Sequence, residues 1–585
     1  MMPTSRFLSR SLCVLTALLL SLSTAAEIRS IAEIHGDGHV PAAGGLEVTT
    51  EGIVTLVADN LFWIQTPGEN HRRSGLGVET AGPPSVARGD HVRISGRIEQ
   101  QRPENRPQDL SITRLLEPRI ELIASGQPLP EPVRIGPGGR DIPSVLAPEH
   151  FDGPLAPEAN AIDFWTALQG MRVELTTNRV VGPTSRFHST WVIAADDHRK
   201  LGRLGTVAVG PDDLNPERIQ VQAHPLLIGP FPEPAGVGER FAAVRGVVDY
   251  RFGDFRILAE HALRPMPADR PVIQGRLSGD AEHVLIASYN VENLNPHIEN
   301  PSRVGSPRDV DDAIGSGRMD EIARHIAQVM NAPDIIGLQE IQDGDGAEDT
   351  EEVSAELTLL ALTEAIVRAG GPQYEWIDFP PERNADGGQP GGNIRNVFLY
   401  NPERVQRVAD SAQRIEGRAF SDSRKPVVSE FIFNGQPLVV INNHFAAKSG
   451  SDPLFGTRHP RVERRASQRT AQAEAILRFG AGLDEQRRVR LVVLGDLNDH
   501  WFSEPLEILT GNEDVPLHNL VTDLPPEERL TYIFQGNAQA IDHILVSRAL
   551  APVSELEILH VNSPNPRQAA DHDPLLARIR LPAPD

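Results

Sequence analysis

The sequence predicts an α/β domain that follows two small β modules. Between residues 48 and 98, short apolar runs alternate with polar residues and are separated by turn-forming residues, which is typical of β-strands. From His283 onward, strand-like runs alternate with helical periodicity, as in 320–330, and this alternation indicates sheets covered by helices. The length of 585 residues is sufficient for three such units.

Residues 1–26 resemble a secretory signal peptide. Arg6 and Arg10 precede an apolar run from 12 to 22, and small residues follow it up to Ala26. The run is shorter than the ~20 residues that span a bilayer, which favours cleavage over the alternative of a retained anchor. The only cysteine, Cys13, lies in this segment, so the mature chain has no disulfide. We therefore expect a bacterial protein that is secreted or periplasmic and leaves the membrane after signal cleavage.

The β-rich part divides into modules at 27–145 and 158–263. Its first strands are expected at 48–56, 61–65, 75–78 and 91–98. The segment 89–96 loosely matches 238–246, which predicts two degenerate copies of one module with the strand rhythm of an oligonucleotide-binding (OB) barrel. Neither copy interleaves basic and aromatic residues clearly, so nucleic-acid contact and a spacer role both stay open. A linker at 264–282 leads to the α/β domain at 283–582.

The net charge is -24, from 80 acidic and 56 basic residues. Such a surface repels polyanions, so a nucleic acid or phosphate ligand needs a local basic patch or a bound cation. Five arginines between 458 and 469 stand against the single acid Glu463, and they are either that patch or a solvated helix face. An acidic run at 343–352 is interpreted as the lead-in to a helix that begins near Ser354, with a Ca²⁺ site as the alternative.

Six strand ends of the α/β domain carry carboxylate, carboxamide or imidazole groups. Each has an ordinary explanation alone, because aspartate and asparagine are common in turns and a single histidine is often structural. Two histidines and several acids in strand-by-strand order instead predict a shared site at one edge of a sheet. The positions are Asn290, Glu292, Asn293, Glu340, His444, Asp496, Asn498, Asp542, Asp571 and His572.

These motifs resemble the endonuclease/exonuclease/phosphatase superfamily, which includes deoxyribonuclease I. The resemblance covers about Leu285 to Ile579 and implies a two-sheet sandwich flanked by helices. Segments 391–400, 423–426 and 531–536 are similar to the secreted bacterial extracellular nuclease branch. One departure is Ile394, which stands where the deoxyribonuclease I type has a glutamate before the arginine. The motifs are Asn290-Val-Glu-Asn293, Leu338-Gln-Glu340, Asn442-x-His444, Gly495-Asp-x-Asn498, Ile541-Asp542-His543 and Asp571-His572.

The resemblance implies a role for each position. Glu340 is the central metal ligand, with Asp571, Asn290 and Glu292 completing or orienting a shell for Mg²⁺, or for Mn²⁺ or Ca²⁺. His572 and Asp542 form a dyad, Asp496 and Asn498 orient or deprotonate the attacking water, and His444 is the opposing acid or a phosphate ligand. The expected phosphate or substrate contacts are Asn293, Arg395, Lys448 and Trp501, and Trp501 is expected to stack a base.

The sequence thus predicts a secreted, metal-dependent phosphodiesterase that hydrolyses nucleic acid, with an extracellular DNA endonuclease favoured and DNA favoured over RNA. A phosphatase or phosphodiesterase for lipid or small-molecule phosphoesters is the first alternative, since the net charge leaves it open. A non-catalytic binding protein is the second, but every ligand and dyad position holds a competent residue. No obligate protein partner is implied.

Overall fold

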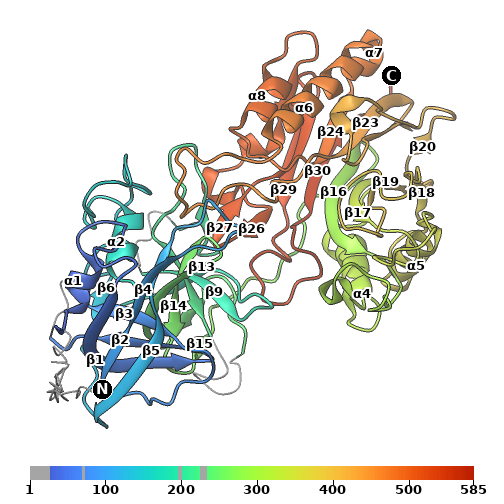
Figure 1. Ribbon diagram of the computed structural model, residues 1–585. Helices are drawn as coiled ribbons and strands as arrows, with labels where there is room; N and C mark the ends of the chain where they lie inside the picture. Colours follow the sequence, from blue (N-terminus) through green and yellow to red (C-terminus); the bar gives the residue numbers. More distant parts are fainter. Residues whose placement is uncertain (1–26, 69–72, 195–200, 224–232, 585) are drawn as a thin grey trace, which may run out of the picture.

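The computed structural model describes residues 27–68, 73–194, 201–223 and 233–584 (Figure 1). The predicted signal peptide, 1–26, lies outside these residues. Figure 1 shows a β-rich N-terminal half beside a C-terminal half in which helices cover sheets. Among the described residues, no helix has the length and apolar character needed to cross a bilayer.

The first module is a closed barrel of five strands in the order β1-β2-β3-β5-β4. Closure leaves no unpaired sheet edge. Helix α1 (Ile31–His35) packs beside it and begins with a capping box, in which Ser30 accepts from the Glu33 amide and Glu33 accepts from the Ser30 amide. The strands are β1 (Glu47–Ala58), β2 (Leu61–Gln65), β3 (Gly75–Glu79), β4 (His91–Gln101) and β5 (Ile112–Ala124).

The second module does not repeat this barrel, so the prediction of two copies of one module is wrong. Its sheet has seven strands in the order β6-β7-β13-β14-β11-β9-β8. Strand β6 falls in the range predicted for the first module, yet it pairs in parallel with β7. The loose match covered one strand and its turn, whereas strand order depends on long-range pairing. The elements are β6 (Val133–Ile135), α2 (Ala161–Ala167), β7 (Arg172–Leu175), β8 (Arg179–Gly182), β9 (Ser189–Ile193), β11 (Arg218–Gln222), β13 (Val244–Arg251) and β14 (Asp254–Ala259), with the small pair β12 (Arg240–Phe241) and β15 (Pro265–Met266).

The C-terminal half confirms the predicted α/β architecture with two main sheets. One has the order β18-β19-β17-β16-β30-β29, and the other β20-β22-β23-β24-β28-β25 with β21 beside β22. Apolar residues of both sheets, such as Ile286, Phe398 and Leu494, share one core. The strands are β16 (His283–Leu294), β17 (Ile335–Ile341), β18 (Glu375–Ile377), β19 (Arg395–Tyr400), β20 (Gln406–Arg407), β21 (Gln413–Arg414), β22 (Val427–Phe433), β23 (Gln436–His444), β24 (Leu491–Asp496), β25 (Leu517–Asn519), β28 (Asp542–Ser547), β29 (Ser554–Ile558) and β30 (Leu575–Arg580).

Helices cover the outer faces of both sheets. The predicted helix at 320–330 is α4 followed by a π-helical turn, η2, and the helix expected near Ser354 begins at Glu356. Helices α4 and α5 pack on the first sheet, and α6 and α8 on the second. The helices are α4 (Arg318–Arg324), η2 (His325–Val329), α5 (Glu356–Arg368), α6 (Ala466–Ala481), α7 (Glu485–Arg488) and α8 (Glu504–Gly511), with 3₁₀ turns η1 (Pro307–Asp309), η3 (Arg418–Phe420), η4 (Leu520–Asp523), η5 (Pro526–Glu528) and η6 (Ala551–Val553).

A buried carboxamide joins the two main sheets. Asn442 on β23 donates to the carbonyl oxygens of Leu338 (3.0 Å) and Val397 (2.9 Å), and it accepts from Gln339 Nε2 (2.7 Å). Gly337 allows the approach, because a Cβ there would lie 2.3 Å from Leu494 Cδ1. Every polar group of Asn442 is therefore bonded, and the ends of β17 and β23 are held together.

The N-terminal modules are joined to each other and to the α/β domain by polar contacts. Arg114 of β5 and Asp249 of β13 form a buried ion pair at 2.5 Å. The Tyr250 hydroxyl donates to the Phe455 carbonyl oxygen (2.8 Å) and accepts from the Leu110 amide (3.0 Å). Strands β10 (Val207–Ala208), β27 (Asn537–Gln539) and β26 (Tyr532–Phe534) form a small sheet shared between the halves.

Replacing Tyr250 with phenylalanine is expected to destabilise the chain by about 1–3 kcal/mol, because the Leu110 amide and the Phe455 carbonyl lose a buried partner. Urea unfolding of the full chain measures the change. Tyr374→Phe is the control, since that hydroxyl bonds only the Pro333 carbonyl, and a smaller loss is expected. Equal losses in both variants would contradict a joining role for Tyr250.

Acid should destabilise the first module through His35. Burial, with the nearby charge of Arg73, lowers the pKa of His35 to about 3. The unfolded chain takes up this proton near pH 6.5, so the stabilisation is complete above pH 6.5 and is lost as the pH falls toward 3. Between pH 6.5 and pH 5 the wild type should lose up to about 2 kcal/mol of unfolding free energy through His35, and the His35→Gln variant should not show this loss. Melting curves at both pH values, with exposed His150→Gln as control, measure it; an unchanged pH dependence would refute the prediction.

Candidate active site

Segments from six places in the sequence converge at one edge of the paired sheets. Strands β23 and β24 run in parallel, with His444 opposite Asp496, and Asp496 also lies opposite Asp542 on β28. Strands β16 and β17 are parallel as well, so their ends meet at the same edge. The side chains come from the end of β16 (Asn290, Glu292, Asn293), the ends of β17 (Glu340), β23 (His444) and β24 (Asp496), the start of β28 (Asp542), and the residues before β30 (Asp571, His572).

Glu340 is held by the segment at the end of β16. Asn290 Nδ2 donates to Glu340 Oε1, and the Asn293 amide donates to Glu340 Oε2, each at 3.1 Å. Glu340 has φ +63°, and Glu292 and Asn293 both have φ +50°. Non-glycine residues seldom adopt this left-handed region, and a glutamate does so less readily than an asparagine. The local backbone is thus shaped to present these side chains.

His444 and Asp496 lie directly beside Glu340. His444 Nε2 is 3.8 Å from Glu340 Oε1 and 3.4 Å from Asp496 Oδ2. Asn290 Nδ2 is also 3.1 Å from Asp496 Oδ2, so one carboxamide bridges the two acids. The Asn498 amide donates to Asp496 Oδ1 at 2.8 Å, which explains the short spacing of the Gly-Asp-x-Asn motif.

Gly495 is required for this arrangement. Its φ is +132°, and a Cβ at this position would lie 2.0 Å from the Asn443 carbonyl oxygen. Any side chain would push β24 away from β23. The glycine therefore brings Asp496 within reach of His444.

His572 and Asp542 form the predicted dyad. His572 Nδ1 donates to Asp542 Oδ2 at 2.7 Å, and the Tyr532 ring stacks on the imidazole with centroids 4.7 Å apart. Nε2 faces the remaining acids, 3.9 Å from both Asp496 Oδ2 and Asp571 Oδ1. The carboxylate and the tyrosine thus fix the ring with one nitrogen directed toward the cluster.

The two histidines have opposite electrostatic surroundings. Burial, with the charges of Arg424 and His572, lowers the pKa of His444 well below its usual value. Burial also opposes the charged form of His572, but Asp542, Asp571 and Asp496 outweigh it and raise the pKa of His572 well above its usual value. The surroundings thus favour the neutral form of His444 and the charged form of His572, and opposite shifts of this kind are how a site separates a proton acceptor from a donor.

Crowding also affects the acids. Burial, reinforced by the charge of Asp542, raises the pKa of Asp496 to about 7. Burial and the charge of Asp571 raise the pKa of Glu292 to about 7, although the cations Arg318 and Arg186 act in the opposite direction. Several carboxylates thus share one partly buried space without enough positive charge to balance them.

These residues fit a divalent cation. Glu340, His444 and Asp496 each offer a ligand atom within 4.8 Å of the others, as do Asp496, Asp542 and His572. Hard cations prefer such carboxylate oxygens, and a cation would relieve the crowding that raises the acids' pKa. Asn290 contacts the predicted ligand directly, because its amide nitrogen donates to Glu340 and its oxygen accepts from the Glu292 amide, and this contact orients the Glu340 carboxylate.

Three predicted substrate contacts do not join the cluster. Arg395 begins a fully buried strand, is 3% exposed, and faces Asp378 at 3.4 Å. Lys448 Nζ is 3.0 Å from Asp499 Oδ1. Trp501 has the Arg529 guanidinium 4.5 Å over its ring and packs against the core between the sheets. Each partner is separated from its residue by many positions in the sequence. The sequence pattern around Arg395, Lys448 and Trp501 therefore does not predict these contacts.

Within the described residues, four of the five arginines between 458 and 469 form ion pairs, so this stretch is not an open basic patch. Arg469 is fully buried against Asp499 (2.7 Å) and Glu463 (3.0 Å). The other pairs within the described residues are Arg458 with Asp452, Arg461 with Glu463, and Arg465 with Asp422. The charge available to a polyanion is therefore much smaller than the sequence suggested.

Two supporting residues were missed. Arg318 donates to the carbonyl oxygens of Ala569 (2.6 Å) and Val291 (2.5 Å), so it ties the end of β16 to the loop that carries Asp571. Tyr532, within the segment 531–536, packs on His572. Arg318 starts α4 without any local polar pattern, so the sequence contains no signal for its role.

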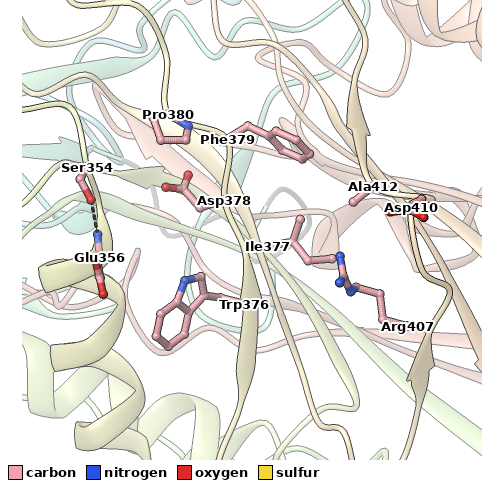
Figure 2. Close-up of a pocket in the computed structure, with 10 residues that line it drawn as sticks. All are labelled: Ser354, Glu356, Trp376, Ile377, Asp378, Phe379, Pro380, Arg407, Asp410 and Ala412. Atoms are coloured by element: carbon pink, nitrogen blue, oxygen red, sulfur yellow. Dashed lines mark hydrogen bonds between the residues drawn. The ribbon is translucent and has the colours of Figure 1, made fainter.

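A separate recess lies elsewhere on the α/β domain (Figure 2). It has a volume of about 590 Å³ and is lined by residues such as Trp376, Asp378 and Phe379 beside β18. None of its lining residues belongs to the Glu340 cluster. The recess and the cluster are thus distinct features.

Comparisons with known proteins identify two regions of the chain. A family model described as Endonuclease/Exonuclease/phosphatase family matches residues 287–572, and one described as Domain of unknown function (DUF8508) matches residues 134–268. No curated protein matches the sequence significantly.

Several solved structures are similar to the chain at low identity. A humanized D. rerio TDP2 with 14 mutations is 16% identical, with 51% of this chain and 99% of that chain covered and a TM-score of 0.33. An endonuclease/exonuclease/phosphatase from Bacteroides vulgatus is also 16% identical, with 51% of this chain and 99% of that chain covered and a TM-score of 0.34. The human Nocturnin catalytic domain with bound sulfate is 15% identical, with 51% of this chain and 94% of that chain covered and a TM-score of 0.35.

Divalent cations should stabilise the chain through Glu340. At about 100 times the dissociation constant, Mg²⁺ or Mn²⁺ is expected to add about 2.7 kcal/mol, because binding to the folded state alone shifts the unfolding equilibrium. Calorimetric titration and melting curves measure the effect. Glu340→Gln should reduce both signals strongly, and Glu364→Gln, at an exposed position on α5, should not. Equal cation stabilisation in the wild type and Glu340→Gln would refute the assignment.

Proposed function

Because residues 287–572 belong to the endonuclease/exonuclease/phosphatase family, we propose that the chain is a metal-dependent phosphodiesterase that hydrolyses nucleic acid. The observation that carries this proposal is the meeting of Glu340, His444 and Asp496 with the His572–Asp542 pair. Phosphodiester hydrolysis needs an activated water on one side of phosphorus and a stabilised leaving oxygen on the other. The cluster contains groups suited to both tasks.

The chain's own residues divide these tasks. Charged His572, oriented by Asp542, holds a proton at Nε2 for a phosphate oxygen or the leaving group. His444, whose surroundings favour the neutral form, and Asp496 lie opposite each other on the neighbouring parallel strands β23 and β24, and they orient or deprotonate the water. Glu340, with Asp571 and Glu292, would hold a divalent cation, and that cation would supply Lewis acidity toward the phosphoryl oxygen. Mg²⁺ is the proposed ion, and Mn²⁺ or Ca²⁺ suits the same oxygen donors.

The finer proposal is an extracellular DNA endonuclease. The order of motifs from 290 to 572 and the signal-like segment before Ala26 support it. The first module's strand order, β1-β2-β3-β5-β4 in a closed barrel, supports an OB-like module that positions substrate. The proposed location is the bacterial periplasm or the medium.

A second candidate is a phosphatase or phosphodiesterase for lipid or small-molecule phosphoesters. The pairing of Arg458, Arg461, Arg465 and Arg469 with acids favours it, because it leaves less positive charge for a long polyanion. The two candidates share one catalytic cluster and differ only in what binds around it.

Activity assays separate these candidates. We expect the mature chain to degrade plasmid DNA, with RNA as a parallel substrate, only when Mg²⁺ or Mn²⁺ is present, and chelator to abolish the reaction. Glu340→Gln and His572→Ala should lose nearly all activity, and Asp542→Asn should lose about 10²–10⁴-fold because the ring loses its orientation and charge. Gel electrophoresis and the hydrolysis of bis(4-nitrophenyl) phosphate measure both kinds of substrate.

The matched control is His518→Ala, which removes a histidine paired with Asp523 at 2.8 Å outside the cluster. This variant should retain activity. Hydrolysis of the small diester without any cleavage of nucleic acid would favour the second candidate. Metal-independent cleavage, or full activity in Glu340→Gln, would overturn the proposed mechanism.

A further inference from the structure

The second β module reaches the edge of the active-site cluster through the loop between β8 and β9. Strand β8 ends at Gly182, where a Cβ would lie 2.8 Å from Gly536 Cα. Gly536 is in the turn between β26 and β27, and β27 pairs in parallel with β10 of the second module. Figure 1 shows β26 and β27 at the junction of the two halves. Residues 183–188 therefore begin next to this hairpin.

The same hairpin supports the dyad. Tyr532, on β26, stacks on His572 at 4.7 Å, and the Phe534 ring stacks on Tyr532 at 6.4 Å. Phe534 is 50% exposed. A row of rings thus leads from the histidine to the surface next to the second module.

Two arginines of different domains lie near the ring of Phe187, which is in the loop between β8 and β9. The Arg186 guanidinium is 5.2 Å from the ring centroid, and the Arg308 guanidinium, on the loop that follows β16, is 5.5 Å from it. Phe187 is 53% exposed. Among the described residues, neither guanidinium has a carboxylate within ion-pair distance. Arg186 is also one of the cations that act against the rise in the pKa of Glu292.

We propose that Phe187, Arg186 and Arg308 form a nucleotide subsite that the second module and the α/β domain build together. A base of a single-stranded segment stacks on Phe187, and the two arginines bind the phosphates on either side of that nucleotide. A base within a duplex is already stacked between its neighbours, whereas an unpaired base has a free face, so the subsite selects single-stranded stretches of polynucleotide. This inference rests on the proposed nuclease function and specifies its substrate.

Phe187→Ala tests the subsite without altering any charge. With a single-stranded 30-mer, its KM should rise roughly 5- to 50-fold while kcat changes little, because a stacked base is lost. Phe187→Trp should restore KM to within about two-fold of the wild type, since any aromatic face can stack. In a Glu340→Gln background with Mg²⁺, fluorescence anisotropy of the labelled 30-mer should show the same increase in Kd for Phe187→Ala.

Phe252→Ala is the matched control. Phe252 is 58% exposed on the same module and lies between Arg251 (4.7 Å) and Arg106 (5.7 Å), but it is in the turn between β13 and β14. Its KM and Kd should match the wild type. A duplex of the same sequence should show less than a two-fold effect of Phe187→Ala.

Each other outcome overturns the inference. If the wild type cleaves nucleic acid and Phe187→Ala leaves KM and Kd unchanged, the subsite is wrong and the nuclease function stands. Equal losses in Phe187→Ala and Phe252→Ala, or equal losses on duplex and single strand, also refute it. If the wild type cleaves no nucleic acid, the proposed nuclease function is wrong. If the Glu340→Gln variant also fails to bind the single-stranded 30-mer, the subsite is wrong as well.

Discussion

The site depends on the bonding of one buried side chain, the Asn442 carboxamide. It satisfies two carbonyl groups of the opposite sheet and accepts from Gln339, so the two sheets cannot slide without leaving buried polar groups unpaired. Glu340 follows Leu338 by two residues, and His444 follows Asn442 by two. The same bonds that join the sheets therefore set the separation of 3.8 Å between the carboxylate and the imidazole.

The cluster places several ionisable side chains close together in a partly buried space, and the surrounding fold fixes their positions. Left-handed backbone at Glu340 and a glycine at 495 present acids in a space too small for all of them to ionise freely. Asp542 and Tyr532 position one imidazole, whereas burial next to Arg424 keeps the other neutral. Hydrogen bonds at the strand ends hold these groups in place before any ligand arrives, which is the preorganisation that hydrolysis of a charged ester requires.

Much of the cluster could be predicted from sequence, because parallel strands deliver their carboxyl-terminal residues to one edge. Glu340, His444, Asp496 and His572 meet as the motif order indicates. The outer contacts could not be predicted. Arg395 and Arg469 are buried by acids that are distant in sequence, and composition alone does not show which charges pair. The second module differs from the first for a similar reason, because pairing between remote strands determines whether a sheet closes.

The sheet shared by β10, β26 and β27 makes the two halves interdependent. Strand β10 comes from the second module, yet it completes the edge of the hairpin that carries Tyr532. A truncated chain beginning at His283 would keep all the acids and both histidines but would lose this strand and expose the edge of β27 to solvent. Kinetic constants measured on such a fragment would consequently describe a less rigid dyad than the one in the intact protein.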